Sequence, residues 1–103
     1  MILYVMADRK VVNDTNYISA KRGNGILRRE IWVNDDGAVT RYNLAYINFA
    51  LHASDNGRVV GYDNAHGYHH RHSFSQVSKV EFTSFEDIEE QFQADWVALR
   101  SGK

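Results

Sequence analysis

The sequence predicts an α+β fold: an antiparallel β-meander with a C-terminal amphipathic helix packed on one face of the sheet. Two observations lead to this prediction. Short segments rich in β-branched and aromatic residues are separated by hairpin-type turn sequences, at residues 35–37 (Asp-Asp-Gly) and 54–57 (Ser-Asp-Asn-Gly). Near the C-terminus the apolar residues are instead spaced three and four apart, which is the spacing of a helix.

Length and composition set the class of protein. The 103 residues fit one domain, which we expect to span residues 1–103, and an apolar fraction of 44% can fill its core. No stretch of 18 apolar residues occurs, so the sequence predicts neither a transmembrane helix nor a membrane partner. The N-terminus lacks the basic region of a signal peptide. The chain has no cysteine, which excludes disulfides and Cys-based zinc sites and favours a cytoplasmic protein.

The first third of the chain predicts two strands. Residues 2–6 form the first, and its extension through Val11 and Val12 stays open. Residues 13–16 (Asn-Asp-Thr-Asn) have the composition of a turn, and the basic, glycine-flanked residues 21–25 that of a loop. Residues 26–34 form the second strand, which ends at the first hairpin turn.

The longest strand candidate spans residues 39–52. Its apolar residues change face partway, which predicts a bulge near Ala45 or a central strand covered on both sides. Residues 58–62 return as the next strand after the second hairpin turn. Residues 76–82 close the sheet after an intervening stretch rich in histidine.

A helix of about four turns follows. Its start carries a capping-box pattern, either Thr83 with Glu86 or Ser84 with Asp87. One apolar stripe then recurs at helical spacing, and acidic residues occupy the rest of the surface. The stripe consists of Phe85, Ile88, Phe92, Trp96 and Leu99.

The small net charge of −1 hides an asymmetry. Residues 1–80 hold ten Lys and Arg against seven Asp and Glu (net +3), whereas residues 81–103 hold two against six (net −4). A basic body can mark a surface that binds a polyanion, and the acidic segment is equally typical of a solvated helix face. The cations that could follow a phosphate backbone are Lys21, Arg22, Arg28, Arg29 and Arg41.

Four of the five histidines fall within residues 61–72, GYDNAHGYHHRH, as His66, His69, His70 and His72. On an extended segment His70 and His72 share a face, so both could bind one transition metal. His66 or His52 would then supply a third nitrogen. The alternative is that these histidines are surface residues without a function.

The same stretch also holds the groups needed to cleave RNA without a metal or any other cofactor. His70 and His72 would act as base and acid, Arg71 would hold the phosphate, and Asp63 would orient an imidazole. On a regular strand, however, Arg71 points away from the face that His70 and His72 share. Further residues could bind the substrate: Tyr62, Asn64, His66 and Arg41.

These residues also carry a resemblance to a known family. Tyr62-Asp63-Asn64, Gly67 and His70-Arg71-His72, followed by Val-Glu-Phe-Thr-Ser-Phe-Glu at residues 80–86, resemble the TumE-like toxins over about residues 41–99. Those are small bacterial and archaeal proteins encoded beside helix-turn-helix antitoxins. The resemblance implies the toxin of a toxin–antitoxin pair, with a cognate helix-turn-helix antitoxin as its partner.

We therefore expect a toxin-like domain that acts as a metal-independent endoribonuclease on an RNA substrate through a His-Arg-His site. A metal-binding domain that uses His70 and His72 is the second hypothesis. A non-catalytic module that binds RNA or a partner protein is the third. The antitoxin could cover either the acidic helix face or the basic histidine cleft, and a homo-oligomer stays open.

Overall fold

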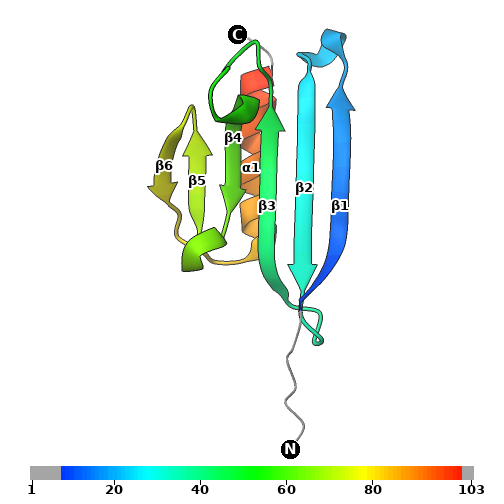
Figure 1. The fold of residues 1–103 in the computed structure, drawn as a ribbon, viewed down its shortest axis with the longest axis vertical. Coiled ribbons are helices and arrows are strands. Elements are labelled where there is room, and N and C mark those ends of the chain that lie inside the picture. The colour runs from blue at the N-terminus through cyan, green and yellow to red at the C-terminus, as the bar shows by residue number, and fades with distance from the viewer. Residues whose placement is uncertain (1–7, 101–103) are drawn as a thin grey trace, which may run out of the picture.

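Each strand of the sheet pairs with the strand that precedes it in the chain. The computed structural model describes residues 8–100, and within them six antiparallel strands lie in the order β1 to β6 (Figure 1). One helix, α1, crosses one face of this sheet. The predicted α+β meander with a C-terminal helix is therefore confirmed. The bounds are β1 Arg9–Ile18, β2 Gly25–Val33, β3 Val39–Ile47, β4 Arg58–Asp63, β5 His70–Ser73, β6 Gln76–Lys79 and α1 Phe85–Arg100.

Both predicted turns are present, but only the first is a tight hairpin, because the second lies at the end of the longer connection formed by residues 48–57. In the first, the Asn34 side-chain oxygen accepts hydrogen bonds from the backbone N–H groups of Asp36 (3.0 Å) and Ala38 (3.1 Å), and Gly37 takes a φ of +82°. In the second, Asn56 and Gly57 have φ values of +54° and +81°. Asn and Gly tolerate this left-handed backbone, so the first turn joins β2 to β3 and the second leads into β4.

The turn predicted at residues 13–16 is wrong, because β1 runs straight through them. Asn13 and Thr15 pair in register with β2, and the Arg28 guanidinium donates hydrogen bonds to their side-chain oxygens, at 2.6 and 3.3 Å. Cross-strand pairing thus overrides the local turn propensity. Val11 and Val12 do belong to β1, whereas the strand predicted at residues 2–6 lies outside the described residues.

Two predicted strands are longer than the observed ones. β3 ends at Ile47, because Asn48 turns the chain and accepts the backbone N–H groups of Leu51 and His52 at its carbonyl oxygen, both at 3.1 Å. β6 ends at Lys79. The irregularity predicted near Ala45 lies one step further on, where the β3–β4 register shifts between Tyr46 and Ile47.

The core fills the space between α1 and the sheet. Ile88 and Phe92 of the predicted stripe are buried against strands β3 and β4, while Phe85, Trp96 and Leu99 pack at its margin. The Ser84 hydroxyl accepts the backbone N–H of Asp87 at 3.1 Å, which identifies Ser84 as the helix cap. The buried sheet residues are Tyr42, Leu44, Tyr46, Val59, Val60 and Tyr62. Among the described residues, no helix is both long and apolar enough to cross a membrane.

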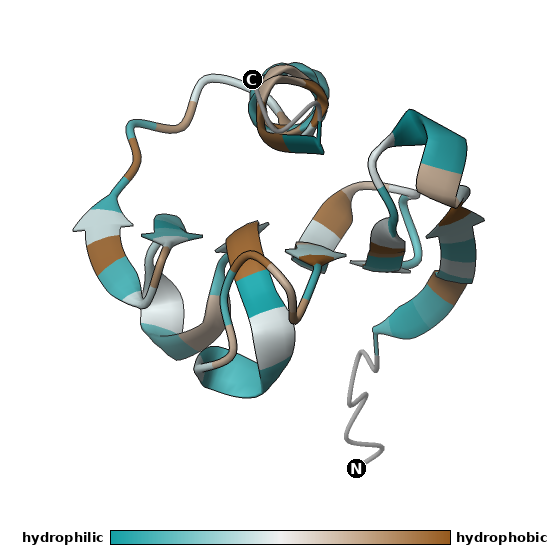
Figure 2. Cartoon of the chain, turned by 90° about the horizontal axis from the view of Figure 1, so that it is seen from above, coloured by the Kyte–Doolittle hydropathy of each residue, from teal (hydrophilic) through white to brown (hydrophobic). Residues whose placement is uncertain are grey.

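The opposite face of the sheet has no helix over it within the described residues, and we call it the open face (Figure 2). Side chains alternate between the two faces along each strand. One irregularity changes this alternation in β4: Tyr46 pairs with Val60 and Ile47 with Arg58, so Val59 is an extra residue. Both Val59 and Val60 consequently enter the core, and Arg58 projects from the same face as Asp63.

Replacing Ile88 with alanine should lower the free energy of unfolding by about 2–5 kcal/mol, because this side chain is fully buried between α1 and the sheet. Val97 on the same helix is 37% exposed, so Val97→Ala should change the free energy of unfolding by less than about 0.5 kcal/mol. Urea denaturation of both variants measures the difference. Equal losses would show that α1 does not pack on the sheet in this orientation.

Candidate functional site

The β4–β5 hairpin assembles the candidate site. In its register Asp63 pairs with His70 and Gly61 with His72, which places Asp63, His70 and His72 on the open face. Tyr62 pairs with Arg71, and these two side chains point toward α1. Strand pairing thus brings Asp63 opposite His70, although a loop separates the two residues in the sequence.

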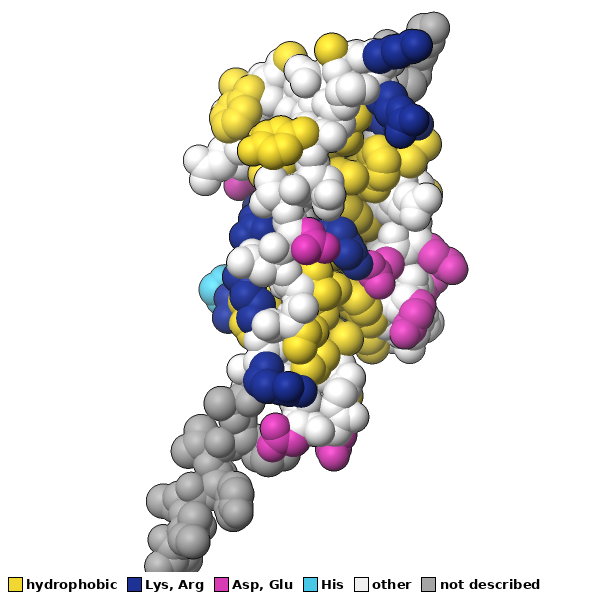
Figure 3. Space-filling model, turned by 90° about the vertical axis from the view of Figure 1, so that its right-hand side faces the viewer, with side chains coloured by type: hydrophobic (Ala, Val, Ile, Leu, Met, Phe, Trp, Pro, Cys, Tyr) yellow, Lys and Arg dark blue, Asp and Glu magenta, His cyan; other side chains and the backbone are white. Residues whose placement is uncertain are grey.

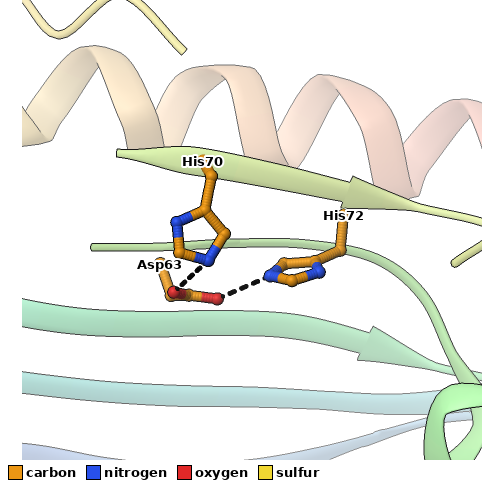
Figure 4. Close-up of side chains that lie close together, drawn as sticks. All are labelled: Asp63, His70 and His72. Carbon is orange, nitrogen blue, oxygen red and sulfur yellow. Dashed lines mark hydrogen bonds and ion pairs between the residues drawn. The ribbon is translucent and has the colours of Figure 1, made fainter. Parts of the chain in front are cut away.

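The Asp63 carboxylate lies between the two imidazoles (Figure 4). His70 Nε2 is 2.7 Å from Asp63 Oδ1, and His72 Nε2 is 2.9 Å from Asp63 Oδ2. Asp63 and His70 are buried, with exposed fractions of 8% and 4%. A charged carboxylate in such a position needs hydrogen-bond donors on both oxygens. The Ala65 backbone N–H donates to Oδ1 at 3.1 Å beside His70, and His72 Nε2 serves Oδ2.

Arg58, which the sequence analysis did not select, is the fourth member of this cluster. Its Nη2 lies 3.0 Å from His72 Nδ1, its Nη1 lies 3.8 Å from Asp63 Oδ2, and its Nε donates to Asp55 Oδ2 at 2.8 Å. Gly61 makes room for it: a Cβ there would be 2.9 Å from Arg58 Cδ and 2.7 Å from the Leu44 carbonyl oxygen. The only feature of the sequence that could have indicated this contact is the position of Arg58 three residues before Gly61 in a predicted strand.

These partners assign the tautomer of His72. Because a guanidinium can only donate, His72 Nδ1 accepts from Arg58, and the single ring proton sits on Nε2 facing Asp63. Burial and then the Arg58 charge lower the pKa of His72 below its ordinary value of 6.5, against the opposing effect of Asp63. His72 is therefore neutral at pH 7. Its stabilising contribution is present above pH 6.5 and is lost as the pH falls through its lower folded-state pKa.

His70 is held differently. Its Nδ1 faces the backbone carbonyl oxygen of Tyr68 at 3.1 Å, and since that oxygen only accepts, Nδ1 carries a proton. Its Nε2 lies 2.7 Å from Asp63 Oδ1, and the Tyr68 ring lies 4.7 Å from the imidazole, centroid to centroid. Both ring nitrogens are engaged within the protein, so His70 fixes the position of the carboxylate.

The structure does not bring Arg71 or Tyr62 to this cluster. On the opposite face, Arg71 Nε donates to Asp95 Oδ2 of α1 at 3.0 Å, and the Tyr62 hydroxyl donates to the same oxygen at 2.6 Å. Burial and then Asp95 raise the pKa of Tyr62 above its ordinary value. The three residues tie β4 and β5 to the helix, so a joint His70-Arg71-His72 site does not form in this arrangement.

Asn64 lies beside the cluster but bonds to the backbone. Its Oδ1 accepts the Tyr42 N–H and its Nδ2 donates to the Thr40 carbonyl oxygen, both at 3.0 Å. The side chain thereby extends the pairing of β4 with β3 by one position. Both polar atoms of the Asn64 side chain are thus engaged by the backbone of neighbouring strand residues.

His52 and His69 lie away from the cluster. His52 Nε2 is 2.7 Å from the Ser75 hydroxyl. His69 Nδ1 is 2.8 Å from the Tyr42 hydroxyl, and its ring stacks on Phe82. Neither is placed to supply the third nitrogen of a metal site.

The cluster forms one wall of a cavity of about 520 Å³ on the open face. His66 and Arg41, predicted as substrate-binding residues, also line it, and the Arg41 guanidinium lies 4.6 Å above the Trp32 ring. The cavity therefore collects imidazole, guanidinium, carboxylate and aromatic groups. Such a set suits an anionic, partly aromatic ligand.

Asp63, His70 and His72 place three potential metal-ligand atoms within 4.8 Å of one another. His70 suits a metal, because an Nδ1–H that donates to a carbonyl leaves Nε2 as the ligand atom. His72 does not suit one in this arrangement, since the Arg58 hydrogen bond places the proton on Nε2. The donor set accordingly fits a divalent ion only after Arg58 moves away.

Comparison with known proteins gives one match. The family model described as Toxin TumE matches residues 5–100, nearly the whole chain, which confirms the family resemblance seen in residues 41–99. No curated protein and no solved structure matches the chain.

Replacing Arg58 with alanine should raise the pKa of His72. Burial would still lower this pKa, but the Arg58 charge would be gone and Nδ1 would be free to take up a proton. NMR titration of the imidazole carbon-bound protons measures the shift. Arg28→Ala, which removes a cation of the same face that makes no contact with His72 in the described structure, is the matched control. Identical titrations of the two variants would contradict the assigned Arg58–His72 contact.

Proposed function

The chain belongs to the TumE toxin family and is thus the toxin component of a toxin–antitoxin system, and we propose that it acts as a metal-independent endoribonuclease. The observation that carries the proposal is the Asp63–His72 pair. A neutral imidazole presents one ring N–H to a buried carboxylate and keeps the lone pair of its other nitrogen. This is the arrangement of a general base whose protonated form is stabilised by an aspartate.

The proposed reaction is an intramolecular transesterification of RNA. His72 Nδ1 takes the proton of a ribose 2′-OH, and that oxygen attacks the adjacent phosphorus. The bond from phosphorus to the 5′-oxygen of the next nucleotide breaks, and the His72 imidazolium returns the proton to the leaving oxygen. The products are a 2′,3′-cyclic phosphate and a 5′-hydroxyl. Asp63 keeps its negative charge throughout and stabilises the imidazolium through Nε2–H.

Arg58 takes the phosphate-binding role first expected of Arg71. Its Nε bond to Asp55 fixes the guanidinium plane, and both Nη atoms are directed toward the His72–Asp63 pair. A phosphate oxygen that accepts from Nη2 competes with His72 Nδ1 for the same donor. Substrate binding would therefore release the lone pair that acts as the base, and the guanidinium would stabilise charge on the phosphorane.

In this proposal His70 is a positioning residue. It has no free nitrogen, and its contact with Asp63 Oδ1 keeps the carboxylate aligned on His72. His66 and Arg41 line the cavity and are proposed to bind the substrate.

A metal-dependent reaction is the second candidate, favoured by the orientation of His70 alone. In that case Arg58 would leave the cluster and His72 would bind the ion through Nε2. The chemistry would then require an ion, and chelation would abolish it.

The family implies an antitoxin partner, and we propose that it carries a helix-turn-helix domain. The acidic face of α1 and the cavity beside His72 are its two candidate docking surfaces. Of the acidic residues, Glu89 is already paired with Arg29 of β2, so Glu86 and Glu90 are better placed to contact a basic partner. Self-association of the toxin stays a prediction.

His72→Ala and Arg58→Ala should each reduce RNA cleavage by the purified toxin on the order of 10²–10⁴-fold, since one removes the base and the other the phosphate donor. Arg71→Ala should retain most of the activity, because its guanidinium faces α1. Single-turnover cleavage of an RNA oligonucleotide measures all three, with circular dichroism to check folding.

The same assay in EDTA separates the two candidates. Unchanged cleavage agrees with the proposal. Loss of cleavage that added Mn²⁺ or Zn²⁺ restores would favour the metal site. Full activity of His72→Ala, or loss of activity only in Arg71→Ala, would contradict the assigned roles.

A further inference from the structure

The cavity beside His72 is one end of a longer groove on the open face. It shares Asn43 and Arg58 with a second hollow of about 270 Å³. The second hollow shares Ile47 with a third of about 400 Å³. We call the three together the open-face groove.

The groove changes character along its length. The first hollow holds the Asp63–His72 pair, the second is lined by Arg28 and Arg58, and the third by Tyr17 and Phe49. Figure 3, which looks onto the β1 edge, shows exposed hydrophobic side chains near the upper end of the molecule, with Lys and Arg side chains below them. Histidine, cationic and aromatic surfaces thus follow one another.

The two aromatic rings at the far end are unusually exposed. Tyr17 has 79% of its surface accessible and Phe49 62%. Strand register places Tyr17 beside Ile26 and Ile26 beside Ile47, so Tyr17 continues an apolar row of the sheet, and Phe49 lines the same hollow. A Cβ on Gly57 would lie 2.8 Å from the Phe49 ring, so this ring packs tightly on the glycine backbone and is held in place. An exposed aromatic surface that is held in place by packing is typical of a binding site.

Of the two cations in the middle section, Arg28 is the less tightly paired, because Arg58 already contacts Asp55, Asp63 and His72. Arg28 donates its hydrogen bonds to uncharged oxygens of Asn13, Asp14 and Thr15, and its ion pair with Glu30 is long, at 3.7 Å. Glu30 itself is paired with Lys10, and its pKa is lowered by that hydrogen bond. The section therefore favours a chain that carries regular negative charges.

We propose that the open-face groove binds single-stranded RNA, with the phosphates along Arg28 and Arg58 and a base stacked on Tyr17 or Phe49; this rests on the proposed ribonuclease function. Stacking requires an unpaired base, because the faces of paired bases are covered within the duplex. From Asn43, beside Asp63, to Ile47 the strand rises about 13 Å, a distance that about four stacked nucleotides span. The stacked base would then lie a few nucleotides from the scissile phosphate.

Binding can be measured without cleavage. A 2′-O-methyl RNA oligonucleotide of about eight nucleotides lacks the attacking hydroxyl, so fluorescence anisotropy reports affinity alone. Tyr17→Ala should weaken its binding about 5- to 100-fold, as expected for the loss of one base–aromatic stack. Tyr17→Phe should bind as the wild type does, since the ring remains. Phe74→Ala is the matched control: this exposed aromatic, 44% accessible, lies outside the groove and should leave the affinity unchanged.

The outcomes separate this proposal from the ribonuclease proposal. The proposal is supported if Tyr17→Ala binds the RNA more weakly and if the wild type binds the single strand more tightly than its duplex. This holds even if the wild type cleaves no RNA. Equal affinities of wild type and Tyr17→Ala overturn it even if RNA is cleaved. If Tyr17→Ala weakens only the complex with the antitoxin, the aromatic end is a protein interface and the proposal is also overturned.

Discussion

The hydrogen bonds of the Asp63 carboxylate to two histidines are the contact on which the open face depends. A buried carboxylate is unfavourable unless donors satisfy both oxygens, and here one imidazole binds each of them, at 2.7 and 2.9 Å. The β4–β5 register is required for this, because a shift by one residue would send both histidines to the other face. The extra residue Val59 and the bare backbone of Gly61 then admit Arg58 as the fourth group.

The two faces of the β4–β5 hairpin make different contacts. On the helix side, Tyr62 and Arg71 converge on Asp95 and hold the hairpin against α1. On the open side, the Asp63–His72 pair faces the groove. A short strand of four residues can therefore serve packing and chemistry at once, since alternate side chains leave it in opposite directions.

The sequence predicted the meander, the helix and the grouping of Asp63 with His70 and His72, because turn residues, helical spacing and strand alternation are local signals. The alternation of side chains along a strand also predicted that Arg71 would point away from the face that His70 and His72 share, and it points toward α1. Arg58 was missed, since its approach depends on the extra residue Val59, which only the pairing of β3 with β4 determines. The turn predicted at residues 13–16 was wrong for a related reason: pairing of β1 with β2 outweighs local turn composition.

The protonation state of His72 decides the proposed chemistry, because the base, the role of Asp63 and the competition for Arg58 all follow from it. Long-range ¹H–¹⁵N correlation spectra of the imidazole rings at pH 7 measure it directly. We predict that His72 is neutral, with its proton on Nε2 and an unprotonated Nδ1. A neutral His72 with its proton on Nδ1, or an imidazolium at pH 7, would contradict the assigned tautomer and the role of His72 as the base.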